Sequence, residues 1–200
     1  MVSRWTDAAL SAIKRKTKPG LVPDAVIDPG FERELDELRR ELEAESGAEA
    51  GLRALLSGLY LCNGSLEKSH ALAQSVHDAT GSYWHGIMHR MEPDYGNSRY
   101  WFRRTGRHPV FGRLAERTRD FLAEPGVMPA AGTAAAKALS RLASLEEWDP
   151  FLWIDIVAGQ AAGKLGGEGM SAVLHIQWIE LEELLDYTYR ACFGGSLIDR

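Results

Sequence analysis

The sequence predicts an all-α protein, a single compact helical bundle of about seven or eight helices with a Pro/Gly-rich N-terminal arm. Apolar residues recur at helical spacing over most of the chain. No stretch shows sustained alternation of β-branched residues, and no hairpin dipeptide lies between two such runs. No repeat with a period of about 20–50 residues is present, which argues against a repeat array.

Residues 1–30 are predicted to form an N-terminal segment and extended arm, ahead of a single helical domain over residues 31–200. Trp5 to Ile13 has the spacing of a short amphipathic segment. Three prolines and two glycines occupy positions 19–30, and this composition favours an extended chain over a helix.

Helical spacing then continues almost to the end of the chain. Asn63 and Gly64 are suited to stop the second predicted helix, and Ser65 and Ser82 to cap the next two. Pro93 ends the helix before it, because proline lacks the amide hydrogen that a helix interior requires. In order, the predicted helices cover residues 31–45, 50–61, 65–79, 82–92, 112–122, 133–145, 150–162 and 170–193.

Length and composition exclude several classes of protein. The 200 residues suit one domain, and 45% hydrophobic with 26% charged residues is a globular composition. A net charge of −5 argues against nucleic acid as a partner, and no apolar run approaches the ~20 residues that cross a bilayer. Two cysteines and a start unlike a secretory signal make a cytoplasmic location the expectation, with no membrane partner.

The sequence also lacks the well-marked cofactor motifs. Gly159 to Lys164 begins like a phosphate loop, but it has one residue too few between its glycines. Leu165 stands where a Ser or Thr should bind magnesium, and Gly163 to Gly169 fails the dinucleotide fingerprint. There is no HExxH, GxSxG, CxxC pair or EF-hand loop. We therefore expect no nucleotide cofactor.

The strongest functional signal is a run of polar and aromatic residues between positions 65 and 109. Five of the six histidines fall within positions 70–108, where an even distribution would place about 1.2. Functional sites combine titratable groups with large rigid side chains in this way. The five histidines are His70, His77, His85, His89 and His108.

Two of these histidines share a helix face with an acid. At about 100° per residue, His85, His89 and Glu92 fall within roughly 60° of one another. His70 and His77 have the corresponding spacing on the preceding predicted helix. A short turn would fold these two helices back on each other, so that imidazoles face each other across the contact.

Neutral imidazole is the commonest metal ligand in proteins, and this spacing is compatible with a divalent Zn, Fe, Mn or Ni ion. His85 and His89 are the leading candidate ligands, because they lie one helical turn apart. Ordinary hydrogen-bonded helix histidines give the same pattern, so this alternative stays open. The full set of candidate metal ligands is His85, His89, His70, His77 and His175.

Arginine is unusually frequent near the histidines. Residues 90–119 hold eight arginines, no lysine and three acids. Guanidinium groups suit bidentate recognition of carboxylate or phosphate, although pairing with surface acids is the alternative. The candidate substrate-binding residues are Arg90, Trp84, Tyr100, Trp101, Arg103 and Arg104.

Three acids are candidate catalytic residues. Glu92 and Asp94 lie in the polar run and could serve as general acid or base. Asp155 sits inside an apolar run, so we expect it to be buried and therefore paired, protonated or metal-bound. Together with His175, Asp155 is the best candidate for a third ligand or general base outside the run.

These features support two hypotheses. The leading one is a small cytosolic metal-dependent enzyme acting on a polar, anionic small molecule, for which hydrolase, isomerase and lyase chemistry are all compatible. The alternative is a non-catalytic helical ligand-binding or protein-interaction domain with a metal-free His/Arg/Trp pocket. In that case the acidic 31–45 helix and the arm could contribute to a homodimer. A third hypothesis is that the His/Arg/Trp cluster is a hydrogen-bonded polar network within the core, without a ligand.

Overall fold

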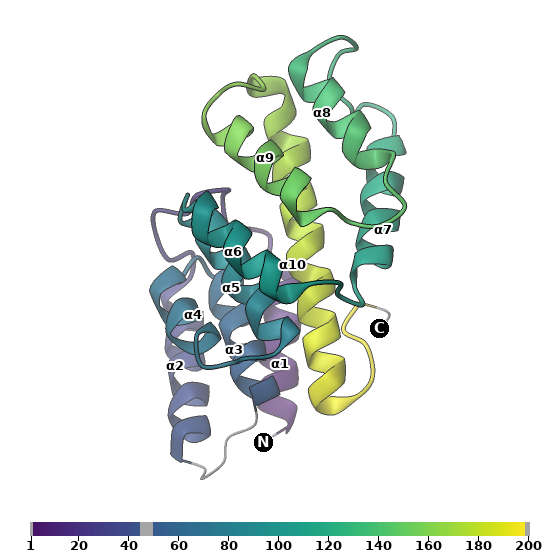
Figure 1. The fold of residues 1–200 in the computed structure, drawn as a ribbon. Helices are drawn as coiled ribbons and strands as arrows, with labels where there is room; N and C mark the ends of the chain where they lie inside the picture. Colours follow the sequence, from purple (N-terminus) through teal and green to yellow (C-terminus); the bar gives the residue numbers. More distant parts are fainter. Residues whose placement is uncertain (1, 45–49, 199–200) are drawn as a thin grey trace.

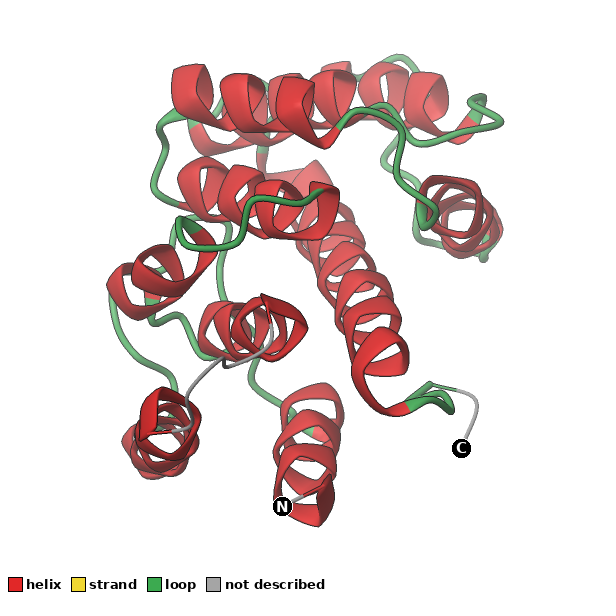
Figure 2. Cartoon of the chain, turned by 60° about the horizontal axis from the view of Figure 1, so that its bottom comes forward, coloured by secondary structure: helices red, strands yellow, loops and turns green. Residues whose placement is uncertain are grey.

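The structure is a computed structural model that describes residues 2–44 and 50–198. These residues form ten α-helices and one short 3-10 helix, and no strand is found among them, so the all-α prediction is confirmed (Figure 2). In order, the elements are α1 (Val2–Lys14), α2 (Pro29–Ala44), α3 (Ala50–Cys62), α4 (Leu66–Ala73), α5 (Ala79–Met91), α6 (Tyr95–Thr105), α7 (Phe111–Ala123), α8 (Ala134–Ala143), α9 (Pro150–Ala161), η1 (Gly167–Gly169) and α10 (Met170–Phe193).

Helix α10 is the central element of the fold. Figure 1 shows this long helix running between the group formed by α1–α6 and the group formed by α7–α9. It packs against α1, α3, α7 and α9, and most of its length is buried. The hydrophobic core is continuous from Trp5 in α1 to Leu197 after α10. Both groups of helices therefore pack against α10 and share one hydrophobic core.

Two glycines allow helices to approach α5 closely. A Cβ atom on Gly58 of α3 would lie 2.5 Å from the ring of Trp84. A Cβ atom on Gly86 of α5 would lie 2.9 Å from the ring of Phe102 in α6. Because neither position carries a side chain, Trp84 and Phe102 pack directly against helix backbones, which sets the position of α5 between α3 and α6.

The helix count is higher than the seven or eight that the sequence predicts, because the predicted ranges include neither α1, which was expected only as a short amphipathic segment, nor α6. Helix α6 was not predicted at all. Its buried residues are Ser98, Phe102 and Thr105, so it lacks the apolar periodicity that identifies a helix. Its start is fixed instead by Asp94, whose side chain accepts a 3.0 Å hydrogen bond from the backbone N–H of Asn97.

The predicted 65–79 helix is too long. Helix α4 ends at Ala73, and α5 begins at Ala79, three residues before the cap predicted at Ser82. The cap is Asp78, whose carboxylate accepts a 2.7 Å hydrogen bond from the backbone N–H of Gly81. Asp and Ser cap helices equally well, so the composition alone did not select the right residue.

The arm between α1 and α2 has no regular secondary structure. It is held against α10 by a 3.0 Å hydrogen bond from Gln177 Nε2 to the Gly20 carbonyl and by burial of Leu21 in the core. Among the residues described, none of the helices combines the length and apolar character that crossing a membrane requires.

Candidate metal centre

Helices α4 and α5 pack against each other and bring three histidines together. His70 lies on α4, and His85 and His89 lie one turn apart on α5. One potential ligand atom from each of the three imidazoles lies within 4.8 Å of the others. We call His70, His85 and His89 the histidine triad. The sequence prediction that imidazoles from two helices face each other therefore agrees with this placement.

The rings of the triad are in direct contact. The ring centroids of His70 lie 4.8 Å from His85 and 5.2 Å from His89, both in edge-on arrangements. His85 and His89 are stacked with an interplanar angle of 11° and a centroid distance of 4.9 Å. Because Zn–N bonds are about 2.0–2.1 Å long, ligand atoms up to 4.8 Å apart would have to come closer, by rotation of the side chains, to share one ion.

Two members of the triad are buried without hydrogen bonds. His85 is 2% exposed and His89 is 7% exposed, whereas His70 is partly exposed. Within the described chain, both ring nitrogens of His85 and Nδ1 of His89 have no hydrogen-bond partner. A buried polar atom without a partner costs about 1–3 kcal/mol, so these nitrogens need an explanation.

Burial also holds these imidazoles in the neutral form. It lowers the pKa of His85 to about 3, with smaller contributions from His89 and His70. Burial is likewise the main cause that lowers the pKa of His89, followed by His70, while Glu92 and Asp94 act in the opposite direction. A neutral imidazole keeps a lone pair free, which is the form that binds a metal.

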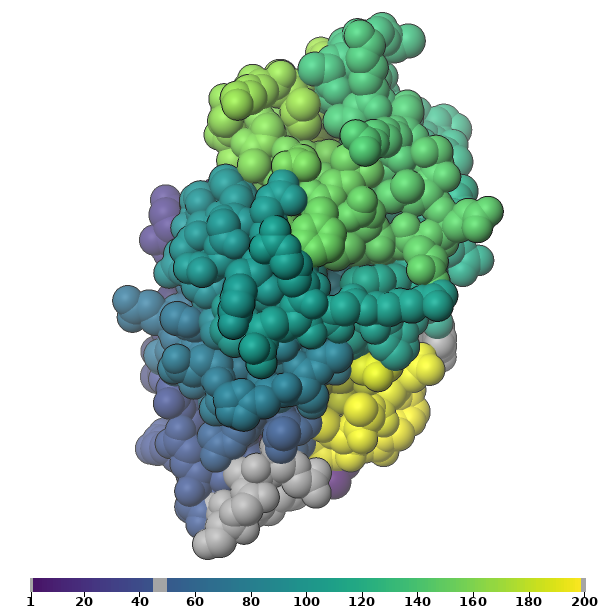
Figure 3. All heavy atoms as spheres, viewed as in Figure 1, coloured from purple at the N-terminus to yellow at the C-terminus, as the bar shows by residue number. Residues whose placement is uncertain are grey.

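Helix α6 supplies the outer wall of the triad. The ring of Trp101 stacks on that of His85, with centroids 3.9 Å apart and an angle of 16°. The guanidinium of Arg104 lies over Trp101 at 5.3 Å and over Tyr100 at 6.0 Å. Tyr100 is 48% exposed, and Arg103 on the same helix is exposed. Figure 3 shows the teal segment that contains α6 on the viewed face of the molecule, next to the green segment that leads into α9.

Two acids lie beside His89. Glu92 follows the end of α5, and its Oε2 is 3.4 Å from His89 Nδ1. The carboxylate of Asp94 is engaged on both oxygens by Asn97, through the backbone N–H at 3.0 Å and Nδ2 at 2.8 Å. The backbone bond from Asn97 is the largest cause of the lowered pKa of Asp94. Asp94 is therefore a weak base that caps α6.

Two candidate substrate-binding residues lie in the core instead of at a surface. Arg90 is fully buried and forms a bidentate ion pair with Glu180 of α10, which is also fully buried. Trp84 is fully buried and donates a 3.2 Å hydrogen bond from Nε1 to Thr188 Oγ1. Both side chains contact residues of α10. Because α5 is buried on nearly every side, neither placement leaves room for a substrate.

Asp155 is exposed, so the expectation that it is buried is wrong. Its side chain is 67% exposed and pairs with Arg99 of α6. The residues on both sides of it, Ile154 and Ile156, are buried, while Asp155 lies on the outward face of α9. Most positions around Asp155 are apolar because α9 is covered on its other sides, so the sequence does not show that this one position faces solvent.

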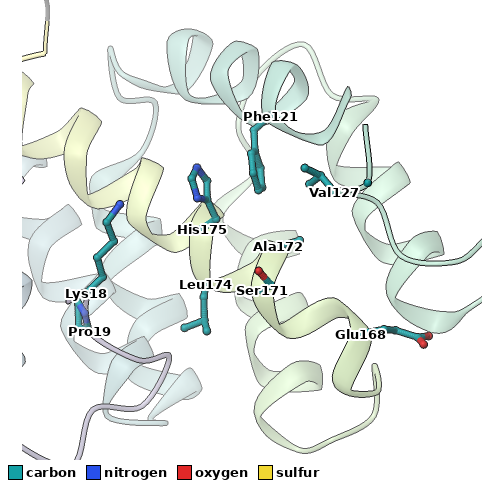
Figure 4. Close-up of a pocket in the computed structure, with 10 residues that line it drawn as sticks. Lys18, Pro19, Phe121, Val127, Glu168, Ser171, Ala172, Leu174 and His175 are labelled. Carbon is teal, nitrogen blue, oxygen red and sulfur yellow. The ribbon is translucent and has the colours of Figure 1, made fainter. Parts of the chain in front are cut away.

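The remaining two candidate ligands lie apart from the triad. His77 is exposed in the linker between α4 and α5, because α4 ends before reaching it. His175 is exposed on α10, where it stacks on Phe121 with centroids 3.9 Å apart. It lines a separate cavity of about 420 Å³. Figure 4 shows its side chain at this cavity with those of Lys18 from the arm and Phe121 from α7.

The sequence reasoning missed Glu180, which holds the buried end of Arg90. Glu180 also accepts hydrogen bonds from Tyr83 Oη and Trp153 Nε1, each at 3.1 Å. The available signal was a glutamate directly beside the apolar residues Ile179 and Leu181, since a carboxylate that is buried with them requires partners.

Comparison with known proteins does not extend this description, since no protein-family model, curated protein or solved structure matches the chain.

Proposed function

We propose that the protein binds one divalent transition-metal ion through His70, His85 and His89, and that it is a metal-dependent enzyme acting on a small anionic molecule. The convergence of these three imidazoles carries the proposal. A shared ion would give the buried His85 ring a partner that, among the described residues, no other group provides.

His108 is an informative comparison, because it is a buried histidine with ordinary hydrogen bonds. Its Nδ1 lies 3.4 Å from the backbone N–H of Val110, and its Nε2 lies 3.2 Å from Thr80 Oγ1. The alternative that the triad consists of hydrogen-bonded helix histidines would require a similar pattern at His85. Neither ring nitrogen of His85 has one within the part of the chain that the structure describes. This contrast favours a metal over the alternative.

The ligand set indicates the class of metal. Three imidazoles suit zinc, iron or nickel, whereas manganese prefers oxygen ligands. Catalytic zinc sites typically have three protein ligands, with water or substrate at the fourth position. An ion bound here would supply Lewis acidity toward a carbonyl or phosphoryl oxygen and lower the pKa of bound water to about 7.

The surroundings of the triad favour an anionic substrate. Arg104 is exposed and has no carboxylate partner among the described residues, and it lies over the Trp101 ring that covers His85. Its guanidinium would orient a carboxylate or phosphate of the substrate near the triad, while Trp101 and Tyr100 would contact the apolar part. Arg103 is a second exposed cation on this helix.

The test is elemental analysis of protein purified without an affinity histidine tag or chelator. We expect about one equivalent of zinc, iron or nickel per chain, which is lost in each of the His70→Ala, His85→Ala and His89→Ala variants. His77→Ala is the matched control, since His77 is exposed outside the triad and should keep the metal. Triad variants that retain full metal content, or wild-type protein that fails to bind added zinc, would contradict the proposal.

One observation favours a second candidate function, a ligand-binding protein that works without a metal. Tyr100, Trp101 and Arg104 form an exposed aromatic and cationic surface that does not depend on an ion. Binding of small organic anions that persists in a chelator and is abolished by Trp101→Ala would support this candidate. Binding that requires the metal would support the enzyme.

A further inference from the structure

The carboxylate of Glu92 is placed against one nitrogen of the triad and not against all three histidines. Its Oε2 lies 3.4 Å from Nδ1 of His89, an atom that is buried. Glu92 is not among the residues whose potential ligand atoms cluster within 4.8 Å in the described chain. Its position is therefore that of a group behind a metal ligand, and not that of a fourth ligand.

Neighbouring charged groups do not account for the position of Glu92. Arg90 is occupied by Glu180 in the core. Asp94, the other acid near His89, is held by Asn97 on both oxygens. The side chain of Glu92 makes no other ion pair or hydrogen bond with the residues that the structure describes. Among the described residues, the His89 ring is therefore the one polar group that its carboxylate approaches.

A metal-binding histidine has two nitrogens with different tasks. One nitrogen donates its lone pair to the metal, and the other carries a hydrogen that is usually donated to a carboxylate, a carbonyl or water. Such a partner fixes the tautomer and the orientation of the ring and makes the ligand more basic. At 3.4 Å the two groups are close but do not form a hydrogen bond in this placement, and Glu92, with a side chain 48% exposed, has the freedom to turn toward the ring.

We infer that Glu92 is a positioning residue, whose carboxylate accepts the Nδ1–H of His89 and thereby reserves Nε2 of His89 for the metal. The role in metal affinity rests on the proposed function, whereas the tautomer of His89 does not. This assignment replaces the expectation that Glu92 acts as general acid or base. It also states which of the two His89 nitrogens binds the ion.

The first experiment measures zinc affinity by competition with a chromophoric chelator. We expect Glu92→Ala to weaken zinc binding by about 10–100-fold, the usual effect of removing a partner of a metal-binding histidine. Glu92→Gln keeps a hydrogen-bond acceptor without the charge, so its affinity should lie between those of Glu92→Ala and wild type. Glu67→Ala is the matched control, because Glu67 is an exposed acid on α4 near His70 and its loss changes the net charge equally.

The second experiment determines the tautomer of His89 by nitrogen-15 NMR, in protein treated with a chelator and in zinc-loaded protein. In both samples we expect wild-type His89 to carry its proton on Nδ1, and in the zinc-loaded sample Nε2 should be the metal-bound nitrogen. In metal-free Glu92→Ala the Nε2–H tautomer should gain population. A merely structural role for Glu92 would leave the tautomer unchanged.

The outcomes separate the two proposals. Zinc affinity of Glu92→Ala within about threefold of wild type, or zinc bound at Nδ1, overturns the inference and leaves the metal site intact. Wild-type protein that binds no zinc overturns the proposed function, and the metal-free tautomer of His89 then decides alone whether Glu92 positions the ring. Unchanged thermal unfolding of Glu92→Ala would show that the loss of affinity is local.

Discussion

His89 and Arg90 are neighbours on α5, yet they belong to two buried polar regions of opposite character. Arg90 pairs with Glu180, which also accepts hydrogen bonds from Tyr83 and Trp153. We call these four residues the Arg90 network. In the histidine triad, by contrast, both nitrogens of His85 and one nitrogen of His89 lack hydrogen-bond partners within the described residues.

The difference indicates what each region contributes. The carboxylate of Glu180 is satisfied by four donors, and only Nε of Arg90 lacks a partner in the described chain, so this network joins α5 to α9 and α10. The triad has no comparable set of hydrogen bonds, so we expect the burial of its nitrogens to cost stability. A region that costs stability and is nevertheless assembled from two helices is typical of a functional site.

The largest predicted effect concerns the Arg90 network. Arg90→Ala and Glu180→Ala should each lower the free energy of unfolding by about 3–5 kcal/mol, because each leaves an uncompensated charge in the core. Urea denaturation followed by circular dichroism measures the change, with Arg104→Ala as a control for loss of an exposed arginine. If either core variant costs no more than the control, the network does not hold α5 in place.

The sequence predicted the fold where apolar periodicity is strong and failed where it is weak. Helix α2 buries Phe31, Leu35, Leu38 and Leu42 at helical spacing, and its bounds nearly match the predicted ones. Helix α6 buries only Ser98, Phe102 and Thr105, and its capping residue Asp94 had been assigned to catalysis instead. An aspartate can cap a helix or act as a general acid or base, and the sequence around it does not distinguish the two roles.

The candidate site was predictable to the extent that helix spacing determines it. His85 and His89 share a face of one helix, and a hairpin brings His70 to them. Spacing could not exclude His77, because the end of α4 at Ala73 depends on the linker to Asp78. The side on which Asp155 lies depends on how α9 packs against its neighbours, which periodicity cannot specify in a helix that is apolar on almost every face.

The second prediction uses His108, a buried histidine with hydrogen bonds, as a reference for the triad. Burial lowers the pKa of His108 to about 4, so between pH 6.5 and 4 the unfolded chain binds a proton that the folded chain resists. The contribution of His108 to stability is therefore full above about pH 6.5 and is lost as the pH falls to about 4, a loss of about 3 kcal/mol.

Urea denaturation from pH 7.5 to 4 in the presence of a chelator measures this loss. His108→Asn keeps an acceptor for the Val110 N–H but does not titrate, so its stability should fall less steeply than that of the wild type, by up to about 3 kcal/mol over this range. If the free energy of unfolding depends on pH in the same way in both proteins, His108 takes up its proton as readily in the folded chain as in the unfolded chain. His108 would then be no reference for the triad.

The smallest predicted effect has the opposite sign and addresses the triad directly. In metal-free protein, His85→Phe should raise the free energy of unfolding by about 1 kcal/mol, because it removes two buried nitrogens without partners in the described chain and keeps a ring against Trp101. Added zinc should stabilise the wild type and leave His85→Phe unchanged, since binding to the folded state alone raises stability. Urea denaturation with chelator and with zinc measures both effects. A variant less stable than the wild type in chelator would show that His85 is a well-accommodated core residue, and the contrast between the triad and the Arg90 network would then no longer point to a metal.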